Sequence, residues 1–414
     1  MKRPAFLTIL GSCALLAGAA HATKLDLSSN VEIRAANYQN LVYGDGRNSQ
    51  SLFSENATLG FVIKDIKLEK TQGSSMDVGI VLPARLPNAN GTPYVRNAYV
   101  KIYNFMRPSV TATFGRQDYR LGQAITLSGG DTGLPGGLLE IENVYRRVKA
   151  DLFAFRPFKT DRYYSVLGGS LYYPAAEGLW QVYHFWQKDS GAGQDMIFNT
   201  LGRTKKFTGV RYFLSQSQLS FDGEAVVQRG SADLAGGGSG KYEAHAFMLK
   251  GAWKQSVPFF GQSHLRLGYG RSSGNPGSAS DTDKAFFPTF GSKNSGLERR
   301  GYGAIAGATI YDMIKTSDTL NGLPHGVSGL NVINIGADLP YKKLTLSADL
   351  YKFRASKNAN DGSLQIASEW DLKASYPMGD NLRLNAVYAV FTPLGLYPSG
   401  SQAKLIYGAI SAKF

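Results

Sequence analysis

Apolar and polar side chains alternate along most of the chain, in segments that turn residues separate from one another. In 343–351, one face carries Leu344, Leu346, Ala348 and Leu350, and the other carries Thr345, Ser347 and Asp349. Because successive side chains of a strand point to opposite faces, this period of two predicts β-strands with one apolar face. Strands of about 9–11 residues are long enough to cross a bilayer.

We predict about 18 strands, an even number as in single-chain bacterial barrels. Their approximate ranges are 25–38, 54–69, 75–84, 95–105, 108–117, 138–148, 149–156, 162–173, 179–188, 204–215, 218–229, 241–254, 262–272, 328–339, 341–353, 365–376, 380–391 and 404–414. The links alternate in length, since 106–107 is short whereas 118–137 and 273–327 are long. This rhythm is typical of short periplasmic turns and long extracellular loops. The predicted fold is all-β, a transmembrane antiparallel β-barrel with both termini in the periplasm.

The link 273–327 differs from the others in length and composition. It begins with a stretch rich in Gly, Ser and Asp, and Ala285–Phe290 then brings three phenylalanines and a proline. Loops of this length are usually functional or disordered, and the aromatic content argues against disorder. We expect either a constriction loop that enters the lumen or a cap over the extracellular mouth. For 302–318 a short helix or an extra strand is considered, although an extra strand would make the count odd.

Residues 1–22 have the features of a cleaved signal peptide, which leaves 23–414 as the barrel. A basic start precedes an apolar run too short to span a bilayer, and Ala20-His21-Ala22 is a small-x-small cleavage site. The single cysteine, Cys13, lies in this segment, where a lipoprotein site is the alternative. Cleavage after residue 22 would leave no thiol for a disulfide or a metal. The last residue, Phe414, closes an alternating strand, as is typical of outer-membrane barrels.

Composition favours the outer membrane of a Gram-negative bacterium. No apolar stretch after residue 22 is long enough for a transmembrane helix, and aromatic residues at 12% suit membrane-interface girdles. The mean hydropathy of -0.20 fits a barrel, because a polar lumen face offsets an apolar outer face. The girdle candidates are Tyr99, Tyr103, Trp180, Tyr183 and Trp186. For Tyr99 and Tyr103, a sugar-stacking track inside the lumen is the alternative.

The net charge of +14 becomes 43 − 31 = +12 when Lys2 and Arg3 leave with the signal peptide. Nucleic acid is not an expected partner, because the basic residues are dispersed and the chain is exported. Two explanations stay open for the excess. External loops would bind the anionic outer leaflet, or a cationic lumen would attract anions.

Charged residues on the polar faces of the predicted strands are the pore-lining candidates. They are Lys101, Arg116, Arg146, Arg211, Arg266 and Arg383 among the basic residues, and Glu140, Asp222, Glu369 and Asp371 among the acidic ones. Opposed ladders of the two signs would hold these side chains extended and narrow the pore. The alternative is that they are ordinary solvated lumen charges.

Enzymatic motifs are absent from the sequence. It contains no G-x-S-x-G, H-E-x-x-H or Walker loop, and its histidines are scattered. We therefore expect no catalytic residues, no metal, no cofactor and no enzymatic activity.

Several segments resemble the alginate-export family of outer-membrane porins. They are FGRQDYRLGQ at 114–123, NVYRRVKADLFAFRPF at 143–158, AFFPTFGSKNSGLERRGYG at 285–303 and VSGLNVINIGADLPYKKLTLSADLYKFRAS at 327–356. The resemblance implies a monomeric 18-stranded barrel, and the best-known member of that family passes an anionic polysaccharide through a pore lined by arginine and lysine. Many members of the family carry an unknown cargo, so alginate itself is not implied.

The leading hypothesis is a passive outer-membrane channel of the alginate-export type for an anionic or polar solute, with a polysaccharide as one candidate. The alternatives are a general or nutrient-uptake porin and a non-conducting structural barrel or adhesin. Expected partners are outer-membrane lipid and lipopolysaccharide, the barrel-assembly machinery, periplasmic chaperones and the solute itself.

Overall fold

A computed structural model describes most of the chain. The described residues are 24–40, 49–68, 73–86, 94–130, 132–159, 162–175, 177–275, 277, 280–292, 301–313, 319–397 and 401–414. The predicted signal peptide and its cleavage site lie outside them. No helix in these ranges is long and apolar enough to cross a membrane.

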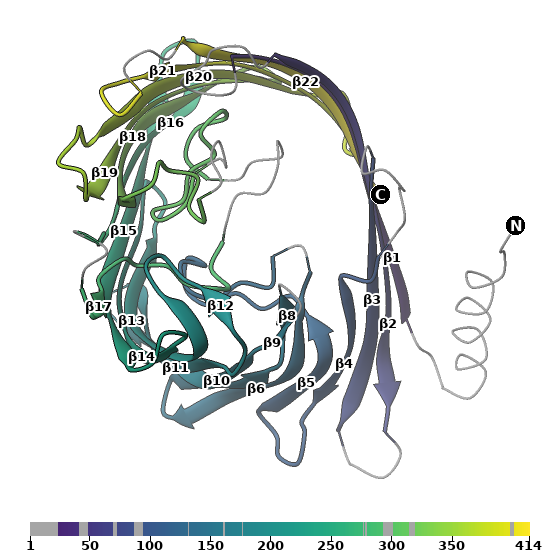
Figure 1. The fold of residues 1–414 in the computed structure, drawn as a ribbon. Helices are drawn as coiled ribbons and strands as arrows, with labels where there is room; N and C mark the ends of the chain where they lie inside the picture. The colour runs from purple at the N-terminus through teal and green to yellow at the C-terminus, as the bar shows by residue number, and fades with distance from the viewer. Residues whose placement is uncertain are drawn as a thin grey trace, which may run out of the picture.

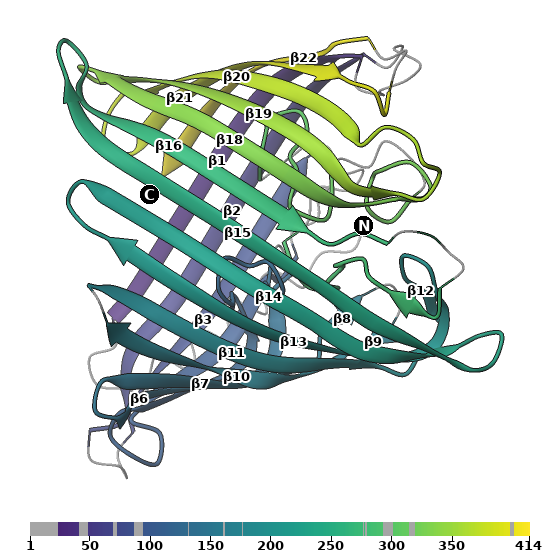
Figure 2. The same cartoon turned by 90° about the vertical axis from the view of Figure 1, so that its left-hand side faces the viewer.

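Eighteen long strands form one closed antiparallel barrel, which confirms the predicted fold (Figures 1 and 2). They are β1 (Lys24–Gln39), β2 (Gln50–Lys67), β3 (Ser75–Leu86), β4 (Asn97–Tyr103), β5 (Val110–Gln117), β6 (Leu134–Tyr145), β7 (Val148–Phe155), β10 (Ser165–Ala175), β11 (Gly178–Asp189), β13 (Asn199–Ser215), β14 (Leu219–Leu234), β15 (Ser239–Val257), β16 (Gly261–Ser272), β18 (Val327–Tyr341), β19 (Leu344–Asn358), β20 (Gln365–Pro377), β21 (Leu382–Pro393) and β22 (Ala403–Lys413). The barrel closes where β1 pairs with both β2 and β22, so that Arg34 lies between Ser54 and Ala409. Closure leaves no strand edge unpaired in the bilayer, as lipid requires.

The alternation in the sequence sets which face of each strand points outward. On β19, Leu346 and Leu350 are exposed on the outer face, and Leu350 is 61% exposed. Asp349 between them points inward and is buried. The predicted facing of this strand is therefore confirmed, and the apolar outer surface is the one that lipid covers.

The links alternate between two ends of the barrel, which we call the short-turn end and the long-loop end. Links 146–147 and 342–343 belong to the short-turn end, as do the start of β1 and the end of β22. Links 118–133 and 273–326 belong to the long-loop end. Four strands of two residues each lie in the long links: β8 (Phe158–Lys159), β9 (Arg162–Tyr163), β12 (Gly193–Gln194) and β17 (Thr282–Asp283).

The main apolar core lies inside the barrel, where the long links pack against the inner faces of the strands. Phe286 and Tyr311 of the β16–β18 link are buried in one cluster with Phe207 of β13 and Phe353 of β19. Figure 1 shows the green segments of this link inside the ring of strands. Its described residues 301–313 form turns rather than the helix or strand considered for 302–318, and 314–318 lie outside the described residues.

Candidate functional site

Two carboxyl groups of β20 hold the β16–β18 link inside the barrel. Glu369 accepts hydrogen bonds from the backbone N–H groups of Ile305, at 2.6 Å, and Ala306, at 2.9 Å. Asp371 accepts one from the N–H of Ala304 at 2.9 Å. Three consecutive N–H groups directed at carboxyl oxygens form a small anion-binding concavity. The strand wall thus fixes the position of the turn 303–306 in the lumen.

The β5–β6 link is held against the wall in a similar way. Glu224 of β14 accepts hydrogen bonds of 2.5 Å from the backbone N–H of Gln123 and from the hydroxyl of Tyr183. Gly122 precedes this contact at a φ of 58°, and a Cβ there would collide with the Glu224 carboxyl. Gly303 also has a positive φ, of 81°, and a Cβ there would collide with the Glu369 carboxyl. Both links therefore need glycine where their backbones approach the wall.

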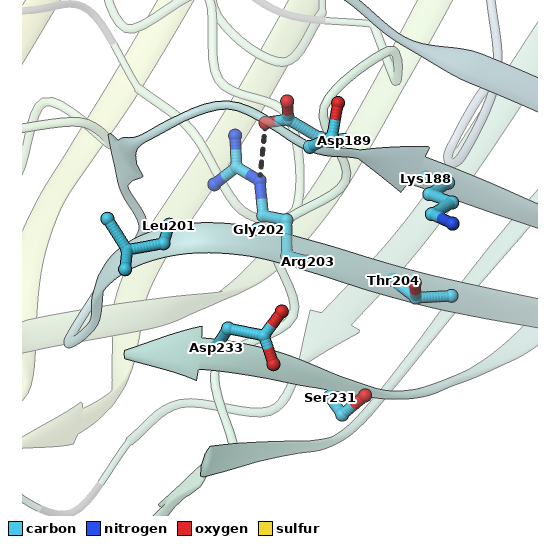
Figure 3. A pocket seen from close by; sticks show the side chains of 9 residues that line it. Lys188, Asp189, Leu201, Gly202, Arg203, Thr204, Ser231 and Asp233 are labelled. Carbon is cyan, nitrogen blue, oxygen red and sulfur yellow. Dashed lines mark ion pairs between the residues drawn. The ribbon is translucent and has the colours of Figure 1, made fainter. Parts of the chain in front are cut away.

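A buried ionic network joins the β11–β13 link to the wall (Figure 3). Asp189 pairs with Arg162 at 3.0 Å and with Arg203 at 3.3 Å. Asp195 pairs with Arg203 at 2.8 Å and with Lys205 at 3.0 Å. Burial acts to raise the pKa of Asp195, but the adjacent Lys205 and Arg203 outweigh burial and hold the pKa below its ordinary value.

The same network also reaches the β16–β18 link. Lys205 donates to the backbone carbonyl of Phe287 at 3.0 Å, which ties that link to β13. Asp283 nearby accepts a hydrogen bond from the N–H of Ala285 at 2.9 Å. Burial raises the pKa of Asp283 to about 6. The β11–β13 link, the β16–β18 link and the strand wall therefore share one set of contacts at the long-loop end.

Farther along the lumen, opposite charges form a ladder on adjacent strands. Arg266 of β16 contacts Asp338 at 3.1 Å and Asp349 at 3.0 Å. Lys373 of β20 contacts the same Asp349 at 3.1 Å, and Asp371 at 3.6 Å. These basic side chains are neutralised locally, so they add little net positive charge to the lumen.

A second lumen group contains a cation, Lys250, that has no direct ion pair of this kind in the described part of the chain. Arg211 of β13 donates two hydrogen bonds of 2.7 Å to Asp222. Lys250 of β15 lies opposite Asp222 in register, points inward and is exposed, and it has no ion pair within the described parts of the chain. The carboxylates of Asp222 and Glu224 and the guanidinium groups of Arg211 and Arg120 all act on the Lys250 ammonium group. Lys250 is therefore a lumen cation without a direct ion pair among the described residues.

The structure places eight of the ten predicted site residues on the inner face. Lys101 and Glu140 pair at 3.0 Å, and Arg383 is exposed near the short-turn end. The other five are Arg211, Arg266, Asp222, Glu369 and Asp371, whose contacts are described above. The participation of all eight in a conducting path stays a prediction. Glu369 and Asp371 are buried beneath a link.

Arg116 and Arg146 do not lie on the inner face. Arg116 shares its strand face with the exposed Phe114, and its guanidinium donates to the backbone carbonyl of Thr132 at 3.1 Å. The alternation along β5 thus places it on the outer face. Arg146 lies in the turn between β6 and β7 with a φ of 53°, and its guanidinium sits 5.2 Å from the centre of the Tyr145 ring.

The predicted aromatic girdle divides between the two faces. Trp180 and Trp186 lie outward and are exposed, as a girdle requires. Tyr183 is buried on the inner face, so its assignment to the girdle was wrong. Tyr99 and Tyr103 also point inward, and the Tyr103 hydroxyl donates to Asp77 at 2.9 Å.

Sequence reasoning missed Arg203, Lys205 and Lys250. Arg203 and Lys205 share the inward parity of Arg211, which was the available signal. Arg203 lay outside the predicted strand, which began at 204 whereas β13 begins at Asn199, and Lys205 lay inside it but was not singled out. Lys250 fell within a predicted strand and on its inward parity. It was not singled out because its neighbours in sequence are mainly apolar.

Solved structures with the same barrel provide the comparison. OccK11 (OpdR) of Pseudomonas aeruginosa has 14% sequence identity and a TM-score of 0.52, covering 94% of this chain and 96% of that chain. OccD3 (OpdP) of the same organism has 11% identity and a TM-score of 0.56, covering 96% and 92%. OccAB1 of Acinetobacter baumannii has 11% identity and a TM-score of 0.56, covering 94% and 97%. The fold is that of an outer-membrane porin. A porin barrel with an apolar outer surface belongs in the outer membrane of a Gram-negative bacterium.

The resemblance to the alginate-export family finds no support in these comparisons. No family model matches the chain, and no curated protein matches it. The similar structures named above carry Occ names and share the porin fold at low identity. The 18-stranded porin barrel is therefore established, and export of a polysaccharide is not.

Proposed function

We propose that this porin is a passive uptake channel for small polar or anionic solutes. The observation that carries the proposal is the inward folding of its long links, which Glu224, Glu369 and Asp371 hold against the strand wall. A barrel of 16–18 strands without such links encloses a wide aqueous channel. Links packed inside it reduce the width, so small solutes pass and long polymers are disfavoured. Nutrient uptake therefore replaces polysaccharide export as the leading hypothesis.

The preference for anions is supported by the group around Lys250. Its ammonium group is exposed in the lumen and has no carboxylate partner among the described residues, while Arg211 is held extended by Asp222. Fixed positive charge between low-dielectric walls raises the local concentration of anions. A small carboxylate or phosphate solute would gain most from this arrangement. The proposal assigns no catalytic step to the chain.

The decisive experiment measures conduction and size selection with the same protein. Purified barrel in planar bilayers should give ohmic single-channel steps, and proteoliposomes should swell with small sugars but not with long oligosaccharides. The absence of steps would favour a structural barrel or adhesin instead. Free passage of long oligosaccharides would contradict the narrowing by the links.

A further inference from the structure

Among the described residues, several basic side chains of the lumen are paired with carboxylates, although Lys250 and Arg383 are not, whereas a set on the outer face has no such pairs. In the lumen, Arg203, Arg211, Arg266 and Lys373 each contact a carboxylate within 3.1 Å. Several outward basic residues are exposed and have no ion pair in the described ranges, and six of them lie on six different strands: Lys188, Lys206, Arg229, Arg271, Lys352 and Lys404. We call these six the basic belt. These six positive charges therefore face away from the pore.

The basic belt has a fixed place on the outer surface. On each of its six strands, the outward side chains are mainly apolar across the bilayer. The member of the basic belt is the first charged outward residue after them, toward the long-loop end. On β14, Arg229 follows the exposed Val227, and on β19, Lys352 follows the exposed Leu350. Outward side chains near the short-turn end are instead aromatic, as at Trp180, Trp253, Tyr376 and Phe414. The two ends thus meet chemically different interfaces.

Two members of the basic belt oppose each other directly. Lys206 of β13 and Arg229 of β14 are paired in register on the outer face. Like charges placed opposite each other destabilise a sheet unless an anion lies between them. Glu243 lies opposite Arg229 on the other side, but no ion pair forms between the two. The pair therefore keeps free capacity for an anionic ligand.

A pocket of about 190 Å³ lies on β11, β13 and β14, and its lining residues Thr204 and Ser231 are each two positions from a member of this pair (Figure 3). Its lining includes Lys188 of the basic belt, the hydroxyl-bearing side chains Thr204 and Ser231, and two carboxylates, Asp189 and Asp233. Asp189 is paired with Arg203, which also lines the pocket. Hydroxyl and ammonium groups together donate the hydrogen bonds that phosphate oxygens accept. The pocket extends the donor set of Lys206 and Arg229 along the outer face.

We propose that the basic belt binds the phosphate groups of lipopolysaccharide in the outer leaflet, with Lys206 and Arg229 as its centre. The occupant follows from position, because an outward cation at the border of the apolar band meets a lipid headgroup rather than a passing solute. Long loops mark the extracellular end of such barrels, so the belt faces the leaflet that carries this phosphorylated lipid. Basic residues near an anionic membrane surface each contribute to binding. The site is separate from the lumen and does not depend on the proposed uptake function.

The test compares matched double variants of the folded full-length barrel in detergent. Lys206→Gln with Arg229→Gln removes two charges at the belt, and Lys342→Gln with Lys343→Gln removes two in the β18–β19 turn at the other end. Native mass spectrometry would measure binding of bisphosphorylated lipid A and of the same lipid without phosphates. The belt variant should bind the phosphorylated lipid at least about ten-fold more weakly, and the turn variant should match the wild type. Heat-modifiable migration confirms folding, and unchanged conductance separates this site from the channel.

Three results would overturn the proposal. The first is equal affinity of the belt variant and the wild type, and the second is an equal loss in the turn variant. The third is equal binding of the dephosphorylated lipid, which would assign the attraction to acyl chains. Inorganic phosphate at the same concentration should not displace the lipid; displacement would assign the site to a soluble anion and would also contradict the proposal.

Discussion

The carboxyl group of Glu369 on β20 accepts a 2.6 Å hydrogen bond from the backbone N–H of Ile305, which lies 64 residues earlier in the chain. This contact joins the strand wall to the turn that occupies the lumen. Both partners are buried, so the bond is not exchanged with water. A change at Glu369 should therefore change the width of the passage through the lumen.

Replacing Glu369 by Ala should widen the channel. The N–H groups of Ile305 and Ala306 would lose their acceptor, which costs about 1–3 kcal/mol for each buried group left unpaired. Single-channel conductance and the size limit for sugar uptake should both rise. Glu142→Ala is the matched control, because the Glu142 carboxylate pairs with Lys149 and holds no link inside the lumen. Unchanged conductance in a folded Glu369→Ala variant would show that the turn is held by other contacts.

Lys250 should influence ion selectivity in proportion to its free charge. Lys250→Glu should move the reversal potential in asymmetric salt toward cations, since it reverses a fixed charge inside the lumen. The shift should shrink as salt rises, because screening reaches about 10 Å at 0.1 M ionic strength. Lys352→Glu, on the outer face, should leave the reversal potential unchanged. An equal shift in both variants would mean that distant surface charge governs selectivity.

The facing of β19 can be tested by assembly. Leu346→Arg places a charge in lipid, at a cost of about 2–4 kcal/mol near the midplane, whereas Thr345→Arg points toward the aqueous lumen. Folding into detergent or lipid should fail for the first variant far more often than for the second. Equal yields of the heat-modifiable form would contradict the assignment of the outer face.

The orientation of the barrel can be tested with single cysteines on intact cells. Gly237 lies in the β14–β15 link at the long-loop end, and Met378 lies in the β20–β21 turn at the short-turn end. A membrane-impermeant maleimide should label a cysteine at Gly237 and spare one at Met378. The opposite pattern would invert the predicted topology.

The buried Asp283 should make stability depend on pH. Burial raises its pKa to about 6 from an ordinary value of 3.8, so the folded state retains a proton that the unfolded state has released between these values. The contribution of Asp283 to the free energy of unfolding is complete below about pH 4 and declines as the pH rises through about 6. Asp283→Asn should lack this decline. Between pH 4 and pH 6, the apparent melting temperature of the variant should therefore rise relative to that of the wild type. Parallel melting curves across that range would exclude Asp283 as the cause.

The sequence by itself determined the barrel. A strand places successive side chains on opposite faces, so local alternation alone predicts that Leu346 faces lipid and Thr345 faces the lumen. The same rule fixed the strand number, because each crossing of the bilayer repeats the pattern and each turn interrupts it. Only the ends of strands were inexact, as at β13, where polar residues continue the strand beyond the apolar band.

Tertiary structure alone decided what narrows the lumen. The β16–β18 link has no period that relates Ile305 to Glu369, and their contact depends on the path of a loop across the barrel. The same holds for Arg203 and Lys205, whose partners Asp189 and Asp195 lie on another strand and in a link. Arg116 and Arg146 were assigned to the lumen because they are basic. Their backbone positions instead place Arg116 on the outer face of β5 and Arg146 in the β6–β7 turn. Alternation fixes the direction of a side chain along one strand, whereas its partners depend on the register between strands and on loop paths, which no local pattern encodes.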